Sequence, residues 1–244
     1  MIHPSQANSP SQYDSPEINW ASFGSENSPS RIYFKNTIAD FLDKDKITRK
    51  RILDIGCGTG YMCKWFMSEG AAHVEGFDPA KKSIEIAQEK YPDISFKVAT
   101  LEGFSQGEEK IFDTAIAIMV FEHVADLHSA FKKINSLLAP GGVFCLIIGD
   151  KDFHTFLEKD SKLTEVASIE ILNDFGDGTV ETKTVRKLHD GSESTMFDMF
   201  RPLENVRRAA SDNDFKIIKE KTLTSTKRNI PMCYVVLFEK VGNE

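Results

Sequence analysis

The sequence has few cysteines, no long hydrophobic run and no excess of basic residues, and each absence excludes a class of protein. Its longest apolar runs, residues 115–121 and 143–148, are far shorter than the roughly 18 residues that a membrane-spanning helix needs. The first residues contain no basic region followed by an apolar core, and the four cysteines are scattered without metal-ligand spacing. We therefore expect a soluble cytoplasmic protein without a membrane anchor, a disulfide framework or a metal site.

The charge balance is acidic. Lysine and arginine number 30 against 37 aspartate and glutamate residues, which gives a net charge of −7. A chain of this sign gains little from a phosphate backbone, so we do not expect nucleic acid as a partner. The 244 residues are 41% hydrophobic and 27% charged, which suits one large folded domain. We expect this domain to be a monomer or a homodimer.

The first thirty residues differ in composition from the rest of the chain. Four of the nine prolines lie here among many Ser, Asn and Gln residues, which is typical of a linker. Large apolar side chains between Tyr13 and Phe23 interrupt this pattern, although a flexible tail does not need them. We expect residues 1–30 to be a flexible segment that partly folds back as a flap, and residues 31–244 to form a single domain.

From residue 51 onward, short β-rich runs alternate with helical periodicity. This alternation is typical of a parallel sheet that is covered by helices on both faces. Strands are expected at residues 51–55, 73–78, 95–99, 114–119 and 143–148, and helices at 80–91 and 127–138. The sequence therefore predicts an α/β core.

Residues 151–201 interrupt the alternation. Two β-like stretches, 180–188 and 194–200, flank an Asp-Gly pair, which is typical of a hairpin turn. We expect an antiparallel hairpin inserted after the fifth strand. The last two expected strands, 215–223 and 232–241, are separated by a short connection and must therefore be antiparallel to each other.

Three alternate glycines follow the first expected strand. Residues 54–60 read Asp-Ile-Gly-Cys-Gly-Thr-Gly, and Gly56, Gly58 and Gly60 allow the backbone to turn tightly and lie against a ligand. A nucleotide-like ligand is expected there. The dinucleotide fingerprint needs its third glycine where this chain has Tyr61, which disfavours a nicotinamide cofactor.

Asp78 ends the second expected strand, directly after Gly76 and Phe77. Ligands of open α/β sheets bind at the carboxyl ends of the strands, and a carboxylate there can accept hydrogen bonds from both hydroxyls of a ribose. An aspartate in this position is also a common cap for the helix that follows. The neighbouring glycine turn favours the ligand-binding interpretation.

Five segments in this order resemble the ordered motifs of class I S-adenosylmethionine-dependent methyltransferases, and the resemblance covers about residues 31–148. The segments are residues 53–60, 76–78, 112–115, 121–124 and 138–142. The resemblance implies a Rossmann-like α/β fold, a seven-stranded and mostly parallel sheet whose last strand is antiparallel, with helices on both faces. It also implies that the inserted β-hairpin covers the substrate.

The resemblance implies S-adenosylmethionine as cofactor and S-adenosylhomocysteine as product. The implied cofactor-binding residues are Arg31, Asp54, Gly56, Cys57, Gly58, Gly60, Asp78, Pro79, Thr100, Leu101, Glu102 and Met119. Asp54 lies at the methionyl part and Asp78 at the ribose, and two carboxylates suit the sulfonium and ammonium charges of this cofactor. Arg31 is placed to meet its carboxylate. At the adenine edge the family often has an acidic residue where this chain has Thr100, so either Thr100 or Glu102 takes the exocyclic amine.

Methyl transfer from a sulfonium is an in-line displacement, in which the protein mainly holds the acceptor and excludes water. An amine can attack in its neutral form, whereas a hydroxyl needs a nearby base. His123, after the fourth expected strand, and Asp150, after the fifth, are the candidate catalytic residues. The alternative for His123 is a structural histidine that holds its loop.

The favoured function is methylation of a nitrogen or oxygen of a small molecule, because the chain is acidic and has an inserted cover. We expect residues 151–201 and the segment from Tyr13 to Phe23 to form that cover together. The alternatives are a protein or RNA acceptor, a non-catalytic S-adenosylmethionine-binding module of a complex, and a nicotinamide-dependent oxidoreductase.

Overall fold

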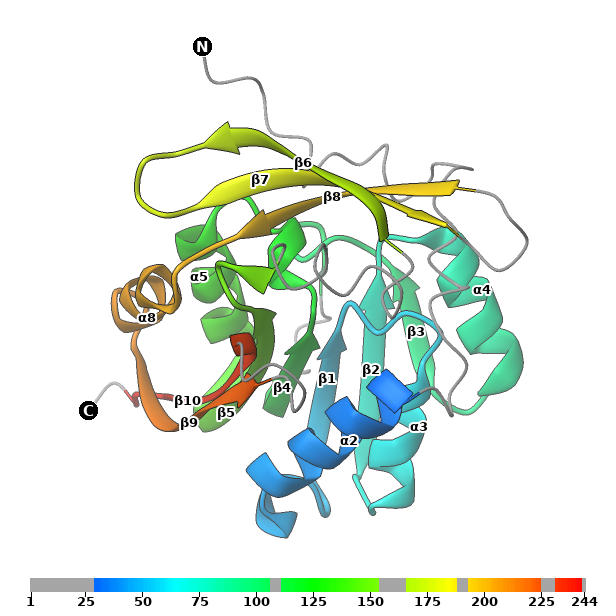
Figure 1. Cartoon of the computed structure of the whole chain (residues 1–244). Coiled ribbons are helices and arrows are strands. Elements are labelled where there is room, and N and C mark those ends of the chain that lie inside the picture. Colours follow the sequence, from blue (N-terminus) through cyan, green and yellow to red (C-terminus); the bar gives the residue numbers. More distant parts are fainter. Residues whose placement is uncertain (1–28, 106–110, 154–165, 188–192, 225–230, 243–244) are drawn as a thin grey trace.

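The computed structural model describes residues 29–242, except for residues 106–110, 154–165, 188–192 and 225–230. The expected flap, within residues 1–30, therefore lies almost entirely outside the described residues. The described residues form two β-sheets, and Figure 1 shows the smaller one lying across one end of the larger.

The larger sheet has seven strands in the order β3-β2-β1-β4-β5-β10-β9. The strands are β1 (Arg51–Ile55), β2 (His73–Asp78), β3 (Ser95–Val98), β4 (Phe112–Ile118), β5 (Leu138–Gly149), β9 (Phe215–Thr224) and β10 (Pro231–Lys240). The first five strands pair in parallel, and β10 pairs antiparallel with both β5 and β9. This arrangement confirms the expected seven-stranded, mostly parallel sheet with an antiparallel last strand.

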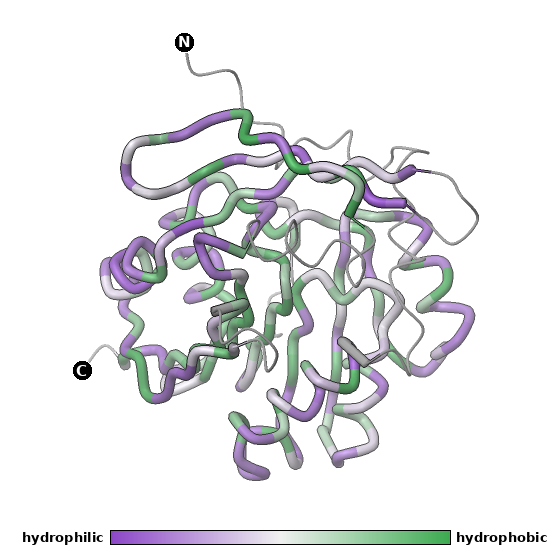
Figure 2. The backbone as a smooth tube through the Cα atoms, viewed as in Figure 1, coloured by the Kyte–Doolittle hydropathy of each residue, from purple (hydrophilic) through white to green (hydrophobic). Residues whose placement is uncertain are grey.

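Apolar residues lie on both faces of this sheet. Successive residues of a strand point to opposite faces, so a strand that is covered on both sides is apolar at nearly every position. On β1, Ile52 belongs to one cluster of buried side chains, whereas Leu53 and Ile55 belong to the other. Figure 2 shows hydrophobic residues concentrated in the central strands. Each face therefore requires a layer of helices.

Helices cover both faces, as the alternation in the sequence predicts. One face carries α2 (Pro29–Phe41), α3 (Tyr61–Ser68) and α4 (Lys81–Lys90), and the other carries α5 (Leu127–Leu137) and α8 (Leu203–Ser211). Short 3-10 turns lie at η2 (Lys44–Lys46) and η3 (Phe121–His123). In α5, Asp126 caps the first turn by accepting a hydrogen bond from the Ser129 N–H, and Phe131 and Ile134 are buried on one side.

The smaller sheet consists of β6 (Val166–Asp174), β7 (Val180–Lys187) and β8 (Glu193–Phe200), and we call it the cover sheet. All its pairings are antiparallel, and β7 with β8 is the hairpin that the sequence predicts. The sequence pattern does not show β6, because five of its nine residues are exposed and no regular apolar alternation remains. The insertion is thus a three-stranded sheet and not a hairpin alone.

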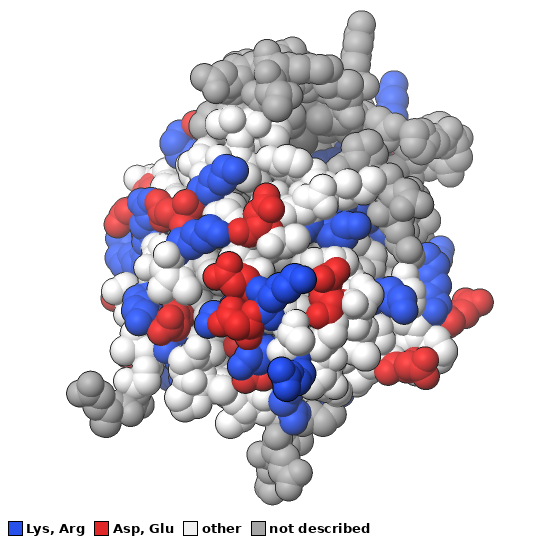
Figure 3. Space-filling view, turned by 90° about the horizontal axis from the view of Figure 1, so that it is seen from below, with Lys and Arg blue, Asp and Glu red and all other residues white. Residues whose placement is uncertain are grey.

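Charges of both signs are interspersed on the face shown in Figure 3, which lies at the opposite end of the larger sheet from the cover sheet. Among the described residues, no helix is long and apolar enough to cross a membrane. The same residues contain no group of three His, Cys, Asp or Glu side chains that could hold a metal ion.

Candidate active site

The parallel strands end at the edge of the larger sheet over which the cover sheet lies (Figure 1). Because the carboxyl ends of parallel strands meet at one edge, residues far apart in the sequence come together there. The ends of β1, β2, β4 and β5 bring Asp54, Asp78, Met119 and Asp150 to this edge.

The glycine loop after β1 is held by main-chain hydrogen bonds. The N–H groups of Gly56 and Cys57 donate to the carbonyl of Phe77 at 2.9 and 3.0 Å. Gly56 has a φ of +68°, and a Cβ added to it would lie 2.4 Å from a methyl carbon of Val120. Gly58 has a φ of +52°, but a Cβ there would meet no atom within 4 Å. The loop is therefore closely packed at Gly56 and open at Gly58, where a ligand can approach its backbone.

Asp78 connects the glycine loop to the next helix. Its Oδ2 accepts a hydrogen bond from the Gly58 N–H at 2.9 Å, and its Oδ1 accepts one from the Ala80 N–H at 2.8 Å. Desolvation raises the pKa of the Asp78 carboxyl, and the two hydrogen bonds oppose this effect. Asp78 thus ties the glycine loop to Ala80, the residue that precedes α4, and each oxygen retains lone-pair capacity for a ligand hydroxyl.

Asp54 is a buried carboxyl beneath the loop. Its Oδ2 lies 3.2 Å from the donor Sγ of Cys63, and its side chain is 3% exposed. Burial raises the pKa of Asp54 to about 7. The thiol of Cys57 is packed against Gly76 of β2, because a Cβ at Gly76 would lie 2.8 Å from that sulfur. Cys57 therefore faces the protein interior with its side chain and offers only its backbone to a ligand.

Arg31 reaches the glycine loop from α2. Its Nη1 donates to the hydroxyl of Thr59 at 3.3 Å, and its guanidinium carbon lies 4.7 Å from the centre of the Tyr61 ring. The aromatic ring and the hydroxyl together orient the guanidinium beside the loop. Gly60 lies between Thr59 and Tyr61 in the sequence, has a φ of +81° and is the N-cap residue of α3.

The turn after β3 lies beside the end of β2, since the Ala99 N–H donates to the carbonyl of Asp78 at 3.2 Å. In this turn the Thr100 hydroxyl accepts a hydrogen bond from the Gly103 N–H at 3.1 Å.

The other residues expected at the adenine differ in exposure. Leu101 is buried and Glu102 is exposed. Pro79 follows Asp78 and is partly buried. The residues expected at the adenine thus come together at the end of β2.

Met119 follows β4 in a strained backbone conformation. Its φ is +54°, a region that residues other than glycine rarely adopt. Its N–H donates to the carbonyl of Ile147 at 2.9 Å, and its sulfur lies 3.8 Å from the thiol of Cys233. Strain of this kind is frequent at binding sites, and the sequence pattern alone does not show it.

His123 joins the sheet edge to the cover sheet. Its Nδ1 lies 3.1 Å from the main-chain carbonyl of Phe197, and its Nε2 lies 3.7 Å from Oδ1 of Asp198. Burial raises the pKa of Asp198, and the charges of His123 and Arg186 oppose this effect. The carboxyl of Asp78 also lies within the electrostatic reach of His123. His123 therefore lies between Asp78 at the end of β2 and the cover sheet.

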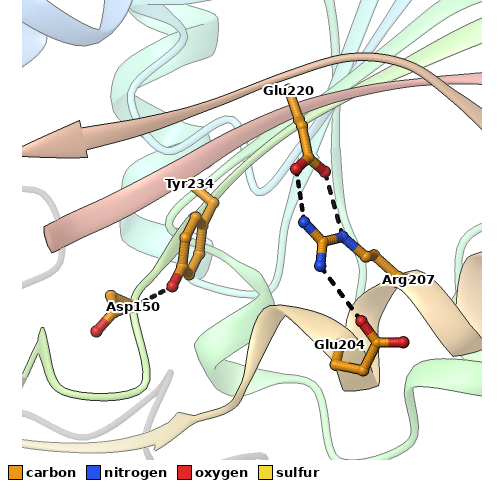
Figure 4. Close-up of polar contacts among 5 residues, drawn as sticks. All are labelled: Asp150, Glu204, Arg207, Glu220 and Tyr234. Carbon is orange, nitrogen blue, oxygen red and sulfur yellow. Dashed lines mark hydrogen bonds and ion pairs between the residues drawn. The ribbon is translucent and has the colours of Figure 1, made fainter.

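Asp150, directly after β5, accepts a hydrogen bond from the hydroxyl of Tyr234 on β10, as Figure 4 shows. Its other oxygen accepts from the Asp152 N–H at 2.9 Å. Burial and the neighbouring Asp150 charge raise the pKa of Tyr234. No sequence pattern indicates this contact, because 84 residues separate the two partners.

Two further buried charged residues at this edge were not expected as site residues. The Oε1 of Glu122 accepts a hydrogen bond from the Gly149 N–H at 2.6 Å, and burial raises the Glu122 pKa. Arg201, just after β8, donates to the main-chain carbonyls of Phe121, at 2.8 Å, and of Val124. Arg201 thereby fixes the end of the cover sheet to the turn that carries His123.

Comparison with known proteins identifies the family. A family model described as a methyltransferase domain matches residues 30–220. The ubiquinone biosynthesis O-methyltransferase of Chromobacterium violaceum is 33% identical over 108 residues, which cover 42% of this chain and 46% of that protein. The protein of the same name from Chelativorans sp. is 34% identical over 125 residues, covering 47% and 49%. The chain thus matches about half the length of these curated relatives.

Solved structures share the fold at low sequence identity. The PH0226 protein from Pyrococcus horikoshii has a TM-score of 0.68 at 20% identity, covering 90% of this chain and 95% of that one. An S-adenosylmethionine-dependent methyltransferase from Mesorhizobium loti has a TM-score of 0.64 at 20% identity, covering 89% and 100%. These likenesses confirm the expected Rossmann-like architecture.

The region matched by the family model contains the glycine loop, Asp78 and the ends of β4 and β5. It includes all five segments on which the resemblance was based. S-adenosylmethionine is accordingly the cofactor, and the chain belongs to the class I S-adenosylmethionine-dependent methyltransferases.

Proposed function

We propose that this enzyme transfers the methyl group of S-adenosylmethionine to a nitrogen or oxygen of a small molecule. The observation that carries this proposal is the attachment of the cover sheet to the site, through the contacts of His123 with Phe197 and Asp198. A small acceptor fits under such a cover, whereas a protein or RNA chain needs an open groove. In this proposal residues 31–244 act as one domain and residues 151–201 act as its substrate cover.

The residues at the edge fit S-adenosylmethionine. The space beside Gly58 is free, since a Cβ there would meet no atom within 4 Å. Asp78 holds the loop and can accept the ribose hydroxyls, and the buried Asp54 offers a negative charge for the ammonium group. Arg31 is oriented toward the same loop for the carboxylate. When bound, S-adenosylmethionine supplies a methyl group on a positively charged sulfur.

The adenine is proposed to lie beside Pro79 and Leu101. Thr100 already accepts a hydrogen bond from the Gly103 N–H. Either its remaining lone pair or the carboxylate of the exposed Glu102 is proposed to accept a hydrogen bond from the exocyclic amine. Gly60, Cys57 and Met119 complete this proposed site through their backbone and, for Met119, through its side chain at the end of β4.

His123 is the proposed base for a hydroxyl acceptor. If its Nδ1–H donates to Phe197, the lone pair of Nε2 is available to take the proton, and Asp198 stabilises the resulting charge. An acceptor oxygen deprotonated in this way would be ready to take the methyl group that bound S-adenosylmethionine would supply, with S-adenosylhomocysteine as the other product. Asp150 and Tyr234 are proposed to contact the acceptor from the β5 and β10 side. The names of the curated relatives support oxygen as the acceptor atom.

Methyl-labelled S-adenosylmethionine and a size-fractionated cell extract test this function. We expect label in the low-mass fraction, and label in protein or RNA would contradict the proposal. His123→Asn keeps a donor for Phe197 but removes the base, so we expect transfer to a hydroxyl to fall about 100-fold with little change in cofactor affinity. If His123 is only structural, the same variant retains its turnover.

A further inference from the structure

One face of the cover sheet is turned toward the active-site edge. Side chains at alternate positions of a strand share a face, so Ser194, Met196, Asp198 and Phe200 of β8 point to the same side. Asp198 lies against His123, and the Phe200 ring lies 3.3 Å from the position of a Cβ added to Gly149. This side therefore faces the ends of β4 and β5.

The register with β7 adds three residues to this face. Thr182 is paired with Asp198, Thr184 with Met196, and Arg186 with Ser194. Paired residues of neighbouring strands lie on the same face of a sheet. The hydroxyls of β7 therefore lie beside Asp198.

Three hydroxyls on this face are buried without a hydrogen-bond partner. The side chains of Thr182, Thr184 and Ser194 are 0% exposed, and within the described ranges none of their hydroxyl oxygens has a partner. Buried threonines elsewhere are satisfied, since the hydroxyl of Thr37 donates to the Tyr33 carbonyl and that of Thr114 to the Lys46 carbonyl. Buried hydroxyls are normally paired, because an unpaired one has lost its water without replacement.

The same face carries charge. The Asp198 carboxyl lies within the electrostatic reach of both His123 and Arg186. Of the seven residues named on this face, only Met196 and Phe200 are apolar. Such a surface would leave its polar groups unpaired against a long apolar chain, and it suits a ligand with several hydrogen-bonding groups.

We propose that Thr182, Thr184 and Ser194 form the acceptor-recognition surface, and that the acceptor is a compact, water-soluble molecule with several hydroxyl or amino groups. This inference rests on the proposed small-molecule methylation and specifies its substrate class. Because the three hydroxyls are fully buried, the acceptor enters when the cover sheet opens, and it completes their hydrogen bonds when the sheet closes.

The variants Thr182→Val and Thr184→Val test the inference, because valine keeps the shape of threonine and removes only the hydroxyl. Thr195→Val is the matched control, since Thr195 lies on β8 at a position that points to the other face. The probes are the water-soluble and the chloroform-soluble low-mass fractions of a cell extract. Transfer of labelled methyl is measured over a dilution series of each fraction, and thermal unfolding is measured without acceptor.

We expect the wild type to label the water-soluble fraction. Each of the two variants should raise the half-saturating amount of that fraction about 3- to 10-fold, the effect of one lost neutral hydrogen bond, with cofactor affinity unchanged. Their thermal unfolding should be unchanged or shifted upward, because no internal hydrogen bond is lost, and the Thr195 variant should behave as the wild type.

Three other results are distinguishable. Label only in the chloroform-soluble fraction overturns this inference and leaves small-molecule methylation standing. An unchanged half-saturating amount in both variants also overturns it alone. Absence of label from every low-mass fraction contradicts the proposed function itself, and this inference falls with it.

Discussion

The proposed cofactor edge and the cover sheet meet at one site but are built in opposite ways. At the edge, the hydrogen bonds of Asp78 to the N–H groups of Gly58 and Ala80 are complete before any ligand binds. On the cover sheet, hydroxyls such as those of Thr182 and Thr184 have no partner within the described residues. A cofactor of constant chemical structure can be bound by main-chain groups whose positions the fold determines. An acceptor is better bound by side chains that can be substituted without disturbing the fold.

The largest expected effect concerns the attachment of the cover sheet. Arg201→Met should lower the free energy of unfolding by about 2 to 4 kcal/mol, because the carbonyls of Phe121 and Val124 lose charge-assisted hydrogen bonds in a buried place. Turnover should fall with it, while cofactor affinity should change little. Chemical denaturation and titration calorimetry measure the two effects.

Arg201→Lys is the control, since it keeps the charge with fewer donors and should lose less stability. If cofactor affinity falls as much as turnover in the Met variant, the edge and the cover sheet are not separable, and the comparison fails.

The second effect concerns the edge alone. Asp78→Ala should weaken S-adenosylmethionine binding by about 1.5 to 3 kcal/mol, because the ribose and the Gly58 N–H both lose their acceptor. Calorimetry gives the affinity. Asp177→Ala is a comparison variant, because Asp177 lies in the turn between β6 and β7 and should leave the affinity intact. Unchanged affinity in the Asp78 variant would remove this residue from the site.

The third effect is a pH dependence. Burial raises the pKa of Asp54 to about 7, so in the free protein its carboxyl is mostly protonated below that pH. A cationic ligand binds the ionised form better, so affinity should fall about tenfold per pH unit below 7 and level off above it. Binding near pH 7 should also release a proton, which calorimetry in buffers of different ionisation enthalpy detects.

Asp54→Asn separates this effect from titration of the ligand, because the variant should bind more weakly and show a flat profile over the same range. The stability of the free protein provides a check of sign. Since the folded-state pKa lies above the unfolded value, Asp54 should lower stability as pH rises from about 4 to 7. An unchanged profile in the Asn variant would show that another group titrates.

The smallest effect comes from two glycines with similar backbone and similar space. Gly58 and Gly141 have φ values of +52° and +70°, and a Cβ at either would meet no atom within 4 Å. Alanine at each should reduce stability by about 1 to 2 kcal/mol for conformational reasons. Only Gly58→Ala should also weaken cofactor binding, because its methyl group occupies ligand space. Equal affinity in the two variants would place the cofactor elsewhere.

The meeting of the glycine loop and Asp78 at one edge could be predicted from sequence because the parts of this proposed cofactor site are local. The three glycines follow one strand directly, and Asp78 ends the next, so the order of elements alone brings them to one edge. The pKa values of the carboxyls at this edge could not be predicted from sequence. Burial raises the pKa of Asp54 to about 7, and no sequence pattern shows how much solvent a side chain retains.

The cover side could not be predicted to the same depth because its contacts join distant segments. His123 and Phe197 are separated by 74 residues, and Arg201 and Phe121 by 80. The period-2 pattern gave the β7–β8 hairpin, but the exposed β6 lacks that pattern. The start of β5 at Leu138 was also missed, because Pro140 and two glycines look like a turn and not like a strand.

The position of β10 has a consequence for how the enzyme is made. This strand follows β9 in the sequence, yet it lies between β5 and β9 in the sheet and supplies Tyr234 to Asp150. Until β10 has been synthesised, β5 presents an open strand edge to other chains, which favours aggregation. The nascent chain can form its glycine loop early, but β5 gains its second neighbour and Asp150 gains its contact with Tyr234 only after β10 has been synthesised.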